Sequence, residues 1–556
     1  MGRDREPRPQ NPKNLIFWGA GATAGLGVSM TATQARFLWE LVGKREDRLE
    51  VRVCKALACK PEQRWRDALF DLLTILGDSE ENDRDIDHFQ DDQLAAMRRN
   101  LPGQPDCDQL RRRILQLRMD YDWPALKAVV RLSPGFESEK FQINDVFNLL
   151  DLHIAPGFGF RAPPMEADGD RKFLTVQRLI GARGALMVTL ISLFYIEYRT
   201  CIACRPAILA DYRDFAGELG RRARSDALAA FARGSGLDTP GFFRAQTGFV
   251  SLNFDPIGLW TQFVAHRELN QTSPPHVGSP ATPLHVFHDF GHMIPARRID
   301  GPDAEWPWYP LNEGSAERLN EEKHPSGYRV VLTKFLFPHG CLCWRHCPDC
   351  GKLSAYHGDT WQLISPSLFP PPPLMAFDDL PIPDNVQGIE RERRLDGAVD
   401  ARACLHCGTL TYARDTQIRM QSSFKTRPPS FVEEVERDLG TAAMTALHFI
   451  FMGYSLPPDD VEYRAFFAAR RRRSGDSPRC TVVSFDAQNR EWRDPLELEK
   501  PGLDPVVQRT VIAARDIFGK DNVRFFGGGV PAVFLGPGGR VTADAVQRLL
   551  RWESGP

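Results

Sequence analysis

The most constraining feature of the chain is a set of short apolar runs in which hydrophobic residues do not alternate with polar ones. A strand with one face in water alternates, whereas a strand buried on both faces is apolar throughout, as in parallel sheets covered by helices. Helical stretches separate the runs, which predicts an α/β fold with a Rossmann-like, mostly parallel sheet. The runs are NLIFW at 14–18, FVSLNFD at 249–255, YRVVLTKFLF at 328–337, HFIFMG at 448–453 and CTVVSFD at 480–486.

Between the first two runs the pattern changes to long helical periods for about 200 residues. Examples are LRRRILQLRMDY at 110–121 and the apolar segment at 171–199. We interpret this block as a large helical insertion within the α/β domain. The expected division is a flexible tail at 1–13, the α/β domain in three parts at 14–50, 249–345 and 411–556, the mainly helical insertion at 51–248, and a small cysteine-containing ribbon with a proline-rich loop at 346–410.

Charge and hydropathy exclude several classes of protein. Lys and Arg number 70 against 72 Asp and Glu, a formal net charge of −2, which gives no reason to expect direct nucleic-acid binding or attraction to a membrane. The longest apolar stretch, about 185–196, is shorter than the ~20 residues of a membrane-spanning helix. The charged start of the chain lacks the apolar core of a secretory signal. We therefore expect a soluble, cytoplasmic protein.

Four of the 12 cysteines form two C-x-x-C knuckles, CPDCGK and CLHCGT, each followed by a glycine. In a chain without an export signal, a metal site is favoured over disulfides. Four thiolates close a tetrahedral zinc site and leave no position for water, so the zinc is expected to be structural. The alternative is two unrelated pairs, which is our interpretation of Cys201 and Cys204. The predicted zinc ligands are Cys347, Cys350, Cys404 and Cys407.

Polar residues and glycines follow three of the predicted strands. GAGATAGLG at 19–27 lies between a strand and a helix, where glycines let the backbone approach a pyrophosphate. Its spacing is G-x-G-x-x-x-G, which departs from the usual fingerprint, and such turns also occur without a ligand. Asn253 and Asp255 end the second run, with an Asx turn as the alternative interpretation. His339 follows the third, with a packed histidine as its alternative.

Three further histidines, His285, His288 and His292, lie in the segment HVFHDFGH. We interpret them as a polar face near the active site, with His288 and His292 one helical turn apart. The alternative is a second metal site, although no nearby carboxylate has the spacing of a ligand.

Taken in order, these motifs resemble the sirtuin family. The shared features are the GAGA(T)xxxG loop, the N-x-D strand end, an HG step leading into a C-x-x-C ribbon, and GYSLPPDD at 453–460 after the second knuckle. They are most similar to the sirtuin-like NAD hydrolase domains of bacterial antiphage defence proteins. The resemblance covers about 14–33 and 249–535, and it implies that the chain binds NAD and cleaves its nicotinamide–ribose bond.

The resemblance also implies a role for each matching residue. Asn253 and His339 are expected to be catalytic, Asn253 by positioning a water molecule and His339 as the general base, a role suited to imidazole. Asp255 is expected with Asn253 near the nicotinamide-side ribose and the carboxamide. The other NAD-binding residues, around the pyrophosphate and the adenosine half, are Gly19, Ala20, Gly21, Thr23, Gly453 and Ser455.

Two departures from the family pattern bear on the reaction. Protein-deacylating members follow the glycine loop with a D-F-R step, whereas this chain reads SMTATQ at 29–34, which disfavours acyl-lysine as the substrate. The strand that often ends in an asparagine touching the adenosine ribose reads VVSFD here. Ser484 or Asp486 therefore substitutes for that asparagine, or the contact is absent.

We expect an NAD glycohydrolase that releases nicotinamide and ADP-ribose, or a cyclic product, and acts in antiphage defence by NAD depletion. NAD is then both cofactor and substrate. An NAD-dependent protein-lysine deacylase is the first alternative, and a non-catalytic NAD or ADP-ribose sensor is the second. Because unregulated NAD hydrolysis would be toxic, we expect the helical insertion, a homo-oligomer interface, or an activating or inhibiting protein partner to hold the site closed.

Overall fold

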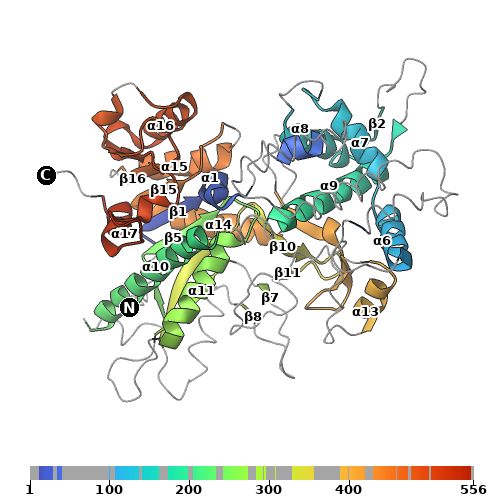
Figure 1. Ribbon diagram of the computed structural model, residues 1–556, viewed down its shortest axis with the longest axis horizontal. Coiled ribbons are helices and arrows are strands. Elements are labelled where there is room, and N and C mark those ends of the chain that lie inside the picture. The colour runs from blue at the N-terminus through green and yellow to red at the C-terminus, as the bar shows by residue number, and fades with distance from the viewer. Residues whose placement is uncertain are drawn as a thin grey trace, which may run out of the picture.

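The computed structural model is a two-lobed molecule in which a sheet domain carries a smaller lobe of helices and short strands (Figure 1). The predicted tail to residue 11, the proline-rich loop at 365–384 and the pair Cys201 and Cys204 lie outside the described residues. The structure describes residues 12–28, 34–39, 99, 107–136, 141–161, 173–197, 205–232, 242–272, 284–291, 294–295, 307–308, 329–355, 388–398, 400–419, 430–458, 460–473, 477–499 and 502–552.

The sheet domain is built on a nine-stranded sheet in which every described pairing is parallel except that of β17 with β18. The strand order is β17–β18–β16–β15–β1–β5–β9, and β4 and β6 also pair with β9. This confirms the prediction of an α/β fold with a mostly parallel sheet. The strands are β1 (Asn14–Trp18), β4 (Phe242–Arg244), β5 (Thr247–Ser251), β6 (Leu284–Asp289), β9 (Arg329–Leu336), β15 (His448–Met452), β16 (Arg479–Val483), β17 (Trp492–Arg493) and β18 (Val523–Phe526).

Helices cover both faces of this sheet, which explains why its strands are apolar throughout. Successive side chains of a strand point to opposite faces. Leu15 and Phe17 pack toward one helical layer, and Ile16 and Trp18 toward the other, each at most 3% exposed. The first layer is α14 (Ser430–Thr445), α15 (Val461–Arg473) and α16 (Pro505–Phe518); the second is α10 (Pro206–Ala232), α11 (Ile257–Thr272) and α17 (Ala543–Leu550).

The second lobe lies beside the sheet domain in Figure 1. It has a hydrophobic core of its own. Its central helix, α9, contains a segment long and apolar enough to cross a membrane by length and composition, but 67% of that segment is buried inside the protein. We therefore describe it as a core helix. The four helices of the lobe are α6 (Cys107–Asp120), α7 (Trp123–Leu132), α8 (Ile143–Ile154) and α9 (Val176–Glu197).

The position of α10 differs from our sequence interpretation. It lies within 51–248, which we interpreted as one insertion, yet it packs on the sheet beside α11 and α17. Arg205, just before this helix, donates to the Gly25 carbonyl at 2.5 Å, and the Tyr212 hydroxyl donates to the carbonyl of Ala22. Helix α10 therefore belongs to the sheet domain and supports its glycine-rich turn.

The cysteine-containing strands pack against the helical lobe. Leu342 and Ile418 enter its hydrophobic core. Tyr121 Oη donates to Asp400 Oδ2 at 2.5 Å, and Arg345 donates to the carbonyl of Asp400, so a buried polar contact joins the two. The elements here are β10 (Gly340–His346), β11 (Leu353–Ala355), α13 (Gly388–Leu395), β12 (Arg402–Ala403), β13 (Leu410–Thr411) and β14 (Thr416–Ile418). Two further short pairs are β2 (Phe160–Arg161) with β3 (Phe173–Leu174), and β7 (Ile294–Pro295) with β8 (Pro307–Trp308).

Candidate functional site

The loops after β1, β5, β9 and β15 meet at one cleft along the carboxyl edge of the sheet. This is the edge at which open parallel sheets bind ligands. The cleft has a volume of about 150 Å³, below the roughly 300–1,000 Å³ of small-molecule pockets, so a dinucleotide needs it to widen. Eight of the residues predicted from the sequence line it: Gly19, Ala20, Thr23, Asn253, Asp255, His339, Gly453 and Ser455.

The glycines of the first and last of these loops are required by close backbone packing. The Gly21 amide donates to the Gly453 carbonyl at 3.0 Å. A Cβ at Gly19 would lie 2.6 Å from the Gly453 carbonyl oxygen, and a Cβ at Gly453 would lie 2.1 Å from the nitrogen of Ala22. Gly453 also has a φ of +59°, which favours glycine. Gly21 lies against Gly453 and is not among the residues that line the cleft; its place at the pyrophosphate stays a prediction.

Asn253 follows β5 and is held rigidly by its neighbours. It is 6% exposed, and its Nδ2 donates to Thr23 Oγ1 at 3.1 Å. Thr23 is fully buried, so its hydroxyl contacts Asn253 rather than pointing toward solvent. The Asn253 side chain also hydrogen-bonds to the Asp255 carboxylate. Because these contacts use the amide nitrogen, the amide oxygen is left to accept a hydrogen bond from a water molecule or a substrate.

Asp255 both lines the cleft and begins the next helix. Its Oδ1 accepts from the amide of Ile257, the first residue of α11, at 3.0 Å, which is the Asx turn expected as the alternative interpretation. Burial raises the pKa of Asp255 to about 6, against the lowering effect of hydrogen bonds from Ile257 and Asn253. This carboxyl therefore titrates closer to neutrality than an exposed one.

His339 lies between β9 and β10 and is 3% exposed. Its Nδ1 lies 3.3 Å from the Leu252 carbonyl oxygen, and its ring contacts Phe254 and Tyr463. Because a carbonyl can only accept, Nδ1 carries the proton, and in the neutral ring Nε2 carries the lone pair. This tautomer is the one that a general base acting through Nε2 needs.

The loop after β15 carries the GYSLPPDD motif and contains strained backbone. Leu456 has a φ of +51° and is only 2% exposed. The Tyr454 hydroxyl donates to Asp460 Oδ2 at 2.7 Å, which closes the loop on itself. Non-glycine residues with positive φ persist where their surroundings impose that conformation, often at ligand-binding loops.

Two cleft residues come from the helical lobe and were missed in the sequence. They are Asn144 of α8 and Phe194 of α9. Gln34, which ends the stretch SMTATQ, also lines the cleft. No local motif marks any of the three, because their role depends on how the two lobes pack.

Of the predicted histidine group, His288 does not line this cleft. His288 lies in strand β6, not in a helix, and is 2% exposed. Its ring stacks on that of His266, with centroids 4.8 Å apart, and it also contacts Phe263. The interpretation as a polar face of the active site was therefore wrong for His288, which is a core residue. His292 and the side chain of His285 lie outside the described part of the chain.

Asp486 follows β16, and its carboxylate accepts hydrogen bonds from backbone amides of the surrounding loops. It is fully buried and accepts from the backbone amides of Gln488, Asn489 and Asp504 at 2.8–3.1 Å. It is therefore a turn-forming residue and not a replacement for the ribose-binding asparagine. Ser484 is half-buried, so either it makes that contact or the contact is absent.

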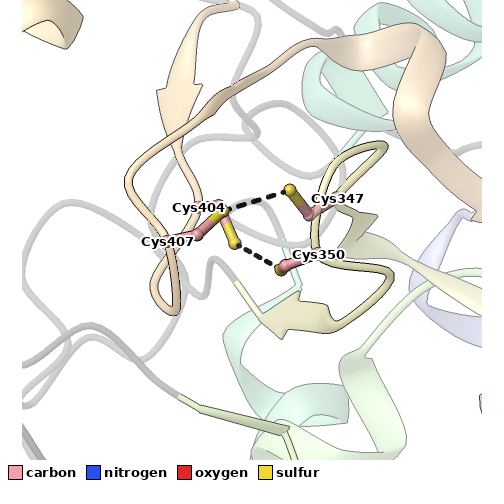
Figure 2. Close-up of side chains that lie close together, drawn as sticks. All are labelled: Cys347, Cys350, Cys404 and Cys407. Atoms are coloured by element: carbon pink, nitrogen blue, oxygen red, sulfur yellow. Dashed lines mark hydrogen bonds between the residues drawn. The ribbon is translucent and has the colours of Figure 1, made fainter.

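The four predicted cysteines converge from two hairpin turns (Figure 2). Their sulfur atoms all lie within 4.8 Å of one another, and the Cys347–Cys407 and Cys350–Cys404 pairs are 3.6 and 3.7 Å apart. Four sulfurs at 2.3 Å from a tetrahedral zinc would be separated by about 3.8 Å. The cluster therefore fits a structural zinc ion, as predicted.

The two turns have the same backbone design. In each, the backbone amide of the first cysteine donates to the carbonyl of the residue two positions after the second cysteine: Cys347 to Lys352, and Cys404 to Thr409. Gly351 and Gly408 have φ of +67° and +78° with open space around them, so conformation rather than crowding requires glycine.

The thiols have different proton affinities in the metal-free cluster. Burial raises the pKa of Cys347 to about 12, whereas a hydrogen bond from Thr409 lowers the pKa of Cys407 to about 6. A bound cation deprotonates thiols outright, so zinc would override these differences.

No protein-family model matches the chain, and no curated protein matches it in sequence. The assignment of the cleft therefore rests on its own residues and their geometry.

Proposed function

We propose that the protein is an NAD glycohydrolase that cleaves the bond between nicotinamide and ribose. The observation that carries the proposal is the convergence of Asn253, Asp255 and His339 with a glycine-rich turn in one cleft at the carboxyl edge of a parallel sheet. The motif order that resembles sirtuins supports NAD as the substrate. The large central sheet and the four-cysteine cluster are compatible with that reading.

Hydrolysis of the nicotinamide–ribose bond requires one aligned water molecule and one base. The bond from ribose C1′ to the nicotinamide nitrogen breaks, its electron pair stays on nicotinamide, and a water oxygen bonds to C1′. Asn253 Oδ1 holds the water, because its Nδ2 is fixed by Thr23. His339 Nε2 accepts the proton, directly or through a ribose hydroxyl, since Nδ1 faces the Leu252 carbonyl. Asp255 accepts hydrogen bonds from the carboxamide.

The test is to incubate purified protein with NAD, with and without an acetyl-lysine peptide, and to follow nicotinamide, ADP-ribose, cyclic product and free lysine peptide by chromatography. We expect nicotinamide release without peptide, reduced about 100-fold or more by Asn253→Ala and by His339→Ala. His153→Ala, on α8 and outside the residues lining the cleft, is the matched control and should leave the rate unchanged.

Two other outcomes would contradict the proposal. Nicotinamide release that requires the peptide would identify a deacylase. NAD binding without turnover in the presence or absence of peptide would identify a sensor. Formation of a cyclic product in place of ADP-ribose would keep Asn253 and His339 in their roles but replace water with an atom of the substrate.

On the resemblance alone, we also propose that NAD depletion serves antiphage defence. Cellular NAD measured in bacteria that express the protein should fall after phage infection and stay constant in the His339→Ala variant. Constant NAD in both strains under infection by a varied phage panel would remove this role.

A further inference from the structure

One wall of the cleft belongs to the helical lobe. Asn144, the second residue of α8, lines the cleft together with Phe194 of α9. Phe194 packs against the hydrophobic cores of both lobes, so the ends of these two helices are held against the sheet domain at the cleft. A substrate in the cleft would therefore contact both lobes.

Asn144 presents a hydrogen-bond acceptor that the described part of the chain does not satisfy. Its Oδ1 is buried and has no donor among the described residues. A buried acceptor without a partner destabilises the folded state, and native proteins retain such groups where a ligand or an ordered water completes them. The stability of the fold therefore does not account for the side-chain oxygen at Asn144.

The other polar side chains around the reaction centre are already oriented by protein contacts. Asn253 is fixed by Thr23, Asp255 by the Ile257 amide and His339 by the Leu252 carbonyl. These groups use part of their hydrogen-bonding capacity to hold position. Asn144 differs, because its acceptor is buried in the wall of the same cleft and has no partner among the described residues.

We propose that Asn144 is a substrate-binding residue supplied by the helical lobe, and that its Oδ1 accepts a hydrogen bond from a hydroxyl or amide N–H group of the dinucleotide. This inference rests on the proposed function. It makes the helical lobe part of the substrate site, so that the affinity for NAD depends on how α8 sits against the sheet domain.

The experiment is calorimetric titration of NAD into the full chain carrying His339→Ala, which keeps NAD intact during the measurement. Adding Asn144→Ala should raise the Kd about tenfold, the effect of one hydrogen bond lost in a shielded site. The melting temperature without NAD should not fall, because alanine removes an unsatisfied buried group and favours the helix. Gln142→Ala, exposed at the same end of α8, is the control and should leave the Kd unchanged.

Asn144→Asp tests whether Asn144 acts as a hydrogen-bond acceptor or only fills space. Aspartate keeps the oxygen and loses the amide nitrogen. We expect it to bind NAD more tightly than Asn144→Ala. Equal affinity of Asn144→Ala and its parent, or weaker binding by Asn144→Asp than by Asn144→Ala, would overturn the inference while leaving the proposed function intact. Failure of the His339→Ala parent to bind NAD at all would overturn both.

Discussion

At the scale of single residues, the site is organised by hydrogen bonds within the protein. Thr23 fixes the Asn253 amide, and Asn253 in turn contacts the Asp255 carboxylate. Thr23 is therefore a positioning residue for Asn253, whereas the family resemblance placed it at the pyrophosphate. Side chains held in this way lose little freedom when the substrate binds, which is the requirement for aligning a water molecule.

Asp255 combines a role in the site with a penalty to stability. Its pKa of about 6 lies above the ordinary value of 3.8, so above pH 6 the folded protein holds a buried charge that the unfolded chain exposes to water. The penalty is complete above the folded pKa and absent below the unfolded one. We expect Asp255→Asn to raise the free energy of unfolding by about 2 kcal/mol at pH 8 and to leave it nearly unchanged at pH 3.5. Urea denaturation at the two pH values measures this difference.

The same variant should lose nicotinamide release, because an amide cannot replace both acceptor oxygens. Asp516→Asn, an exposed residue in the last turn of α16, serves as the control and should change neither quantity appreciably. A loss of stability in Asp255→Asn at pH 8 would show that the hydrogen bonds made by the carboxylate outweigh its burial.

At the scale of elements, the cleft depends on two loops that interlock through glycine. The turn after β1 and the loop after β15 approach so closely that a Cβ at Gly21 would lie 2.9 Å from Gly453 Cα. Neighbouring strands β1 and β15 set this distance through their parallel pairing. The glycines that suggested a phosphate site thus have a structural role, and this role cannot be recognised from the spacing of the motif.

The four-cysteine cluster lies at the other end of β10 from His339. This strand runs from Gly340 to His346, and Cys347 follows it directly. We expect one zinc ion per chain, and we expect Cys350→Ser to lose it and to lower the free energy of unfolding by several kcal/mol. Nicotinamide release should fall in parallel with the folded fraction, because four thiolates leave no open position on the metal for chemistry. Elemental analysis and thermal melting provide the two measurements.

Cys480→Ala is the matched control for zinc content. This thiol is fully buried in β16 of the sheet and takes no part in the four-cysteine cluster. The variant should keep one zinc ion per chain even if it loses some stability. A metal-free Cys350→Ser protein that melts at the wild-type temperature would contradict a structural role for the ion.

At the scale of the whole molecule, the cleft lies where the hydrophobic cores of the two lobes meet. Phe194 contacts both cores, and Tyr121 links the helical lobe to the cysteine-containing strands through Asp400. In the proposed function, the sheet domain provides the reacting groups and the helical lobe provides one wall. A change in how the lobes pack would therefore change the volume of the cleft, which is now smaller than the proposed dinucleotide needs.

Features that depend on local sequence could be predicted, and features that depend on distant packing could not. Buried strands and the C-x-x-C turns have signals within a few residues, and β1, β15 and the cysteine cluster occur where the sequence placed them. Helical periodicity predicts that α10 is a helix, but it does not predict that this helix packs on the sheet. The spacing of His288 and His292 fits a helix, yet pairing with β9 makes 284–289 a strand. Asn144 lies in no recognisable motif, because only the packing of the two lobes makes it part of the cleft.

Three buried histidines make the stability of the whole molecule sensitive to acid. Burial lowers the pKa values of His266 and His448 to about 3 and that of His288 well below its usual 6.5. Below about pH 6 these histidines therefore bind protons in the unfolded chain but not in the folded protein. The free energy of unfolding falls as the pH drops. With three such groups the slope approaches about 4 kcal/mol per pH unit near pH 5, partly offset by Asp255. Urea denaturation between pH 7.5 and pH 5 should show this fall, and His288→Leu should reduce its slope by about a third. An equal slope in His288→Leu and wild type would mean that His288 accepts a proton inside the folded core.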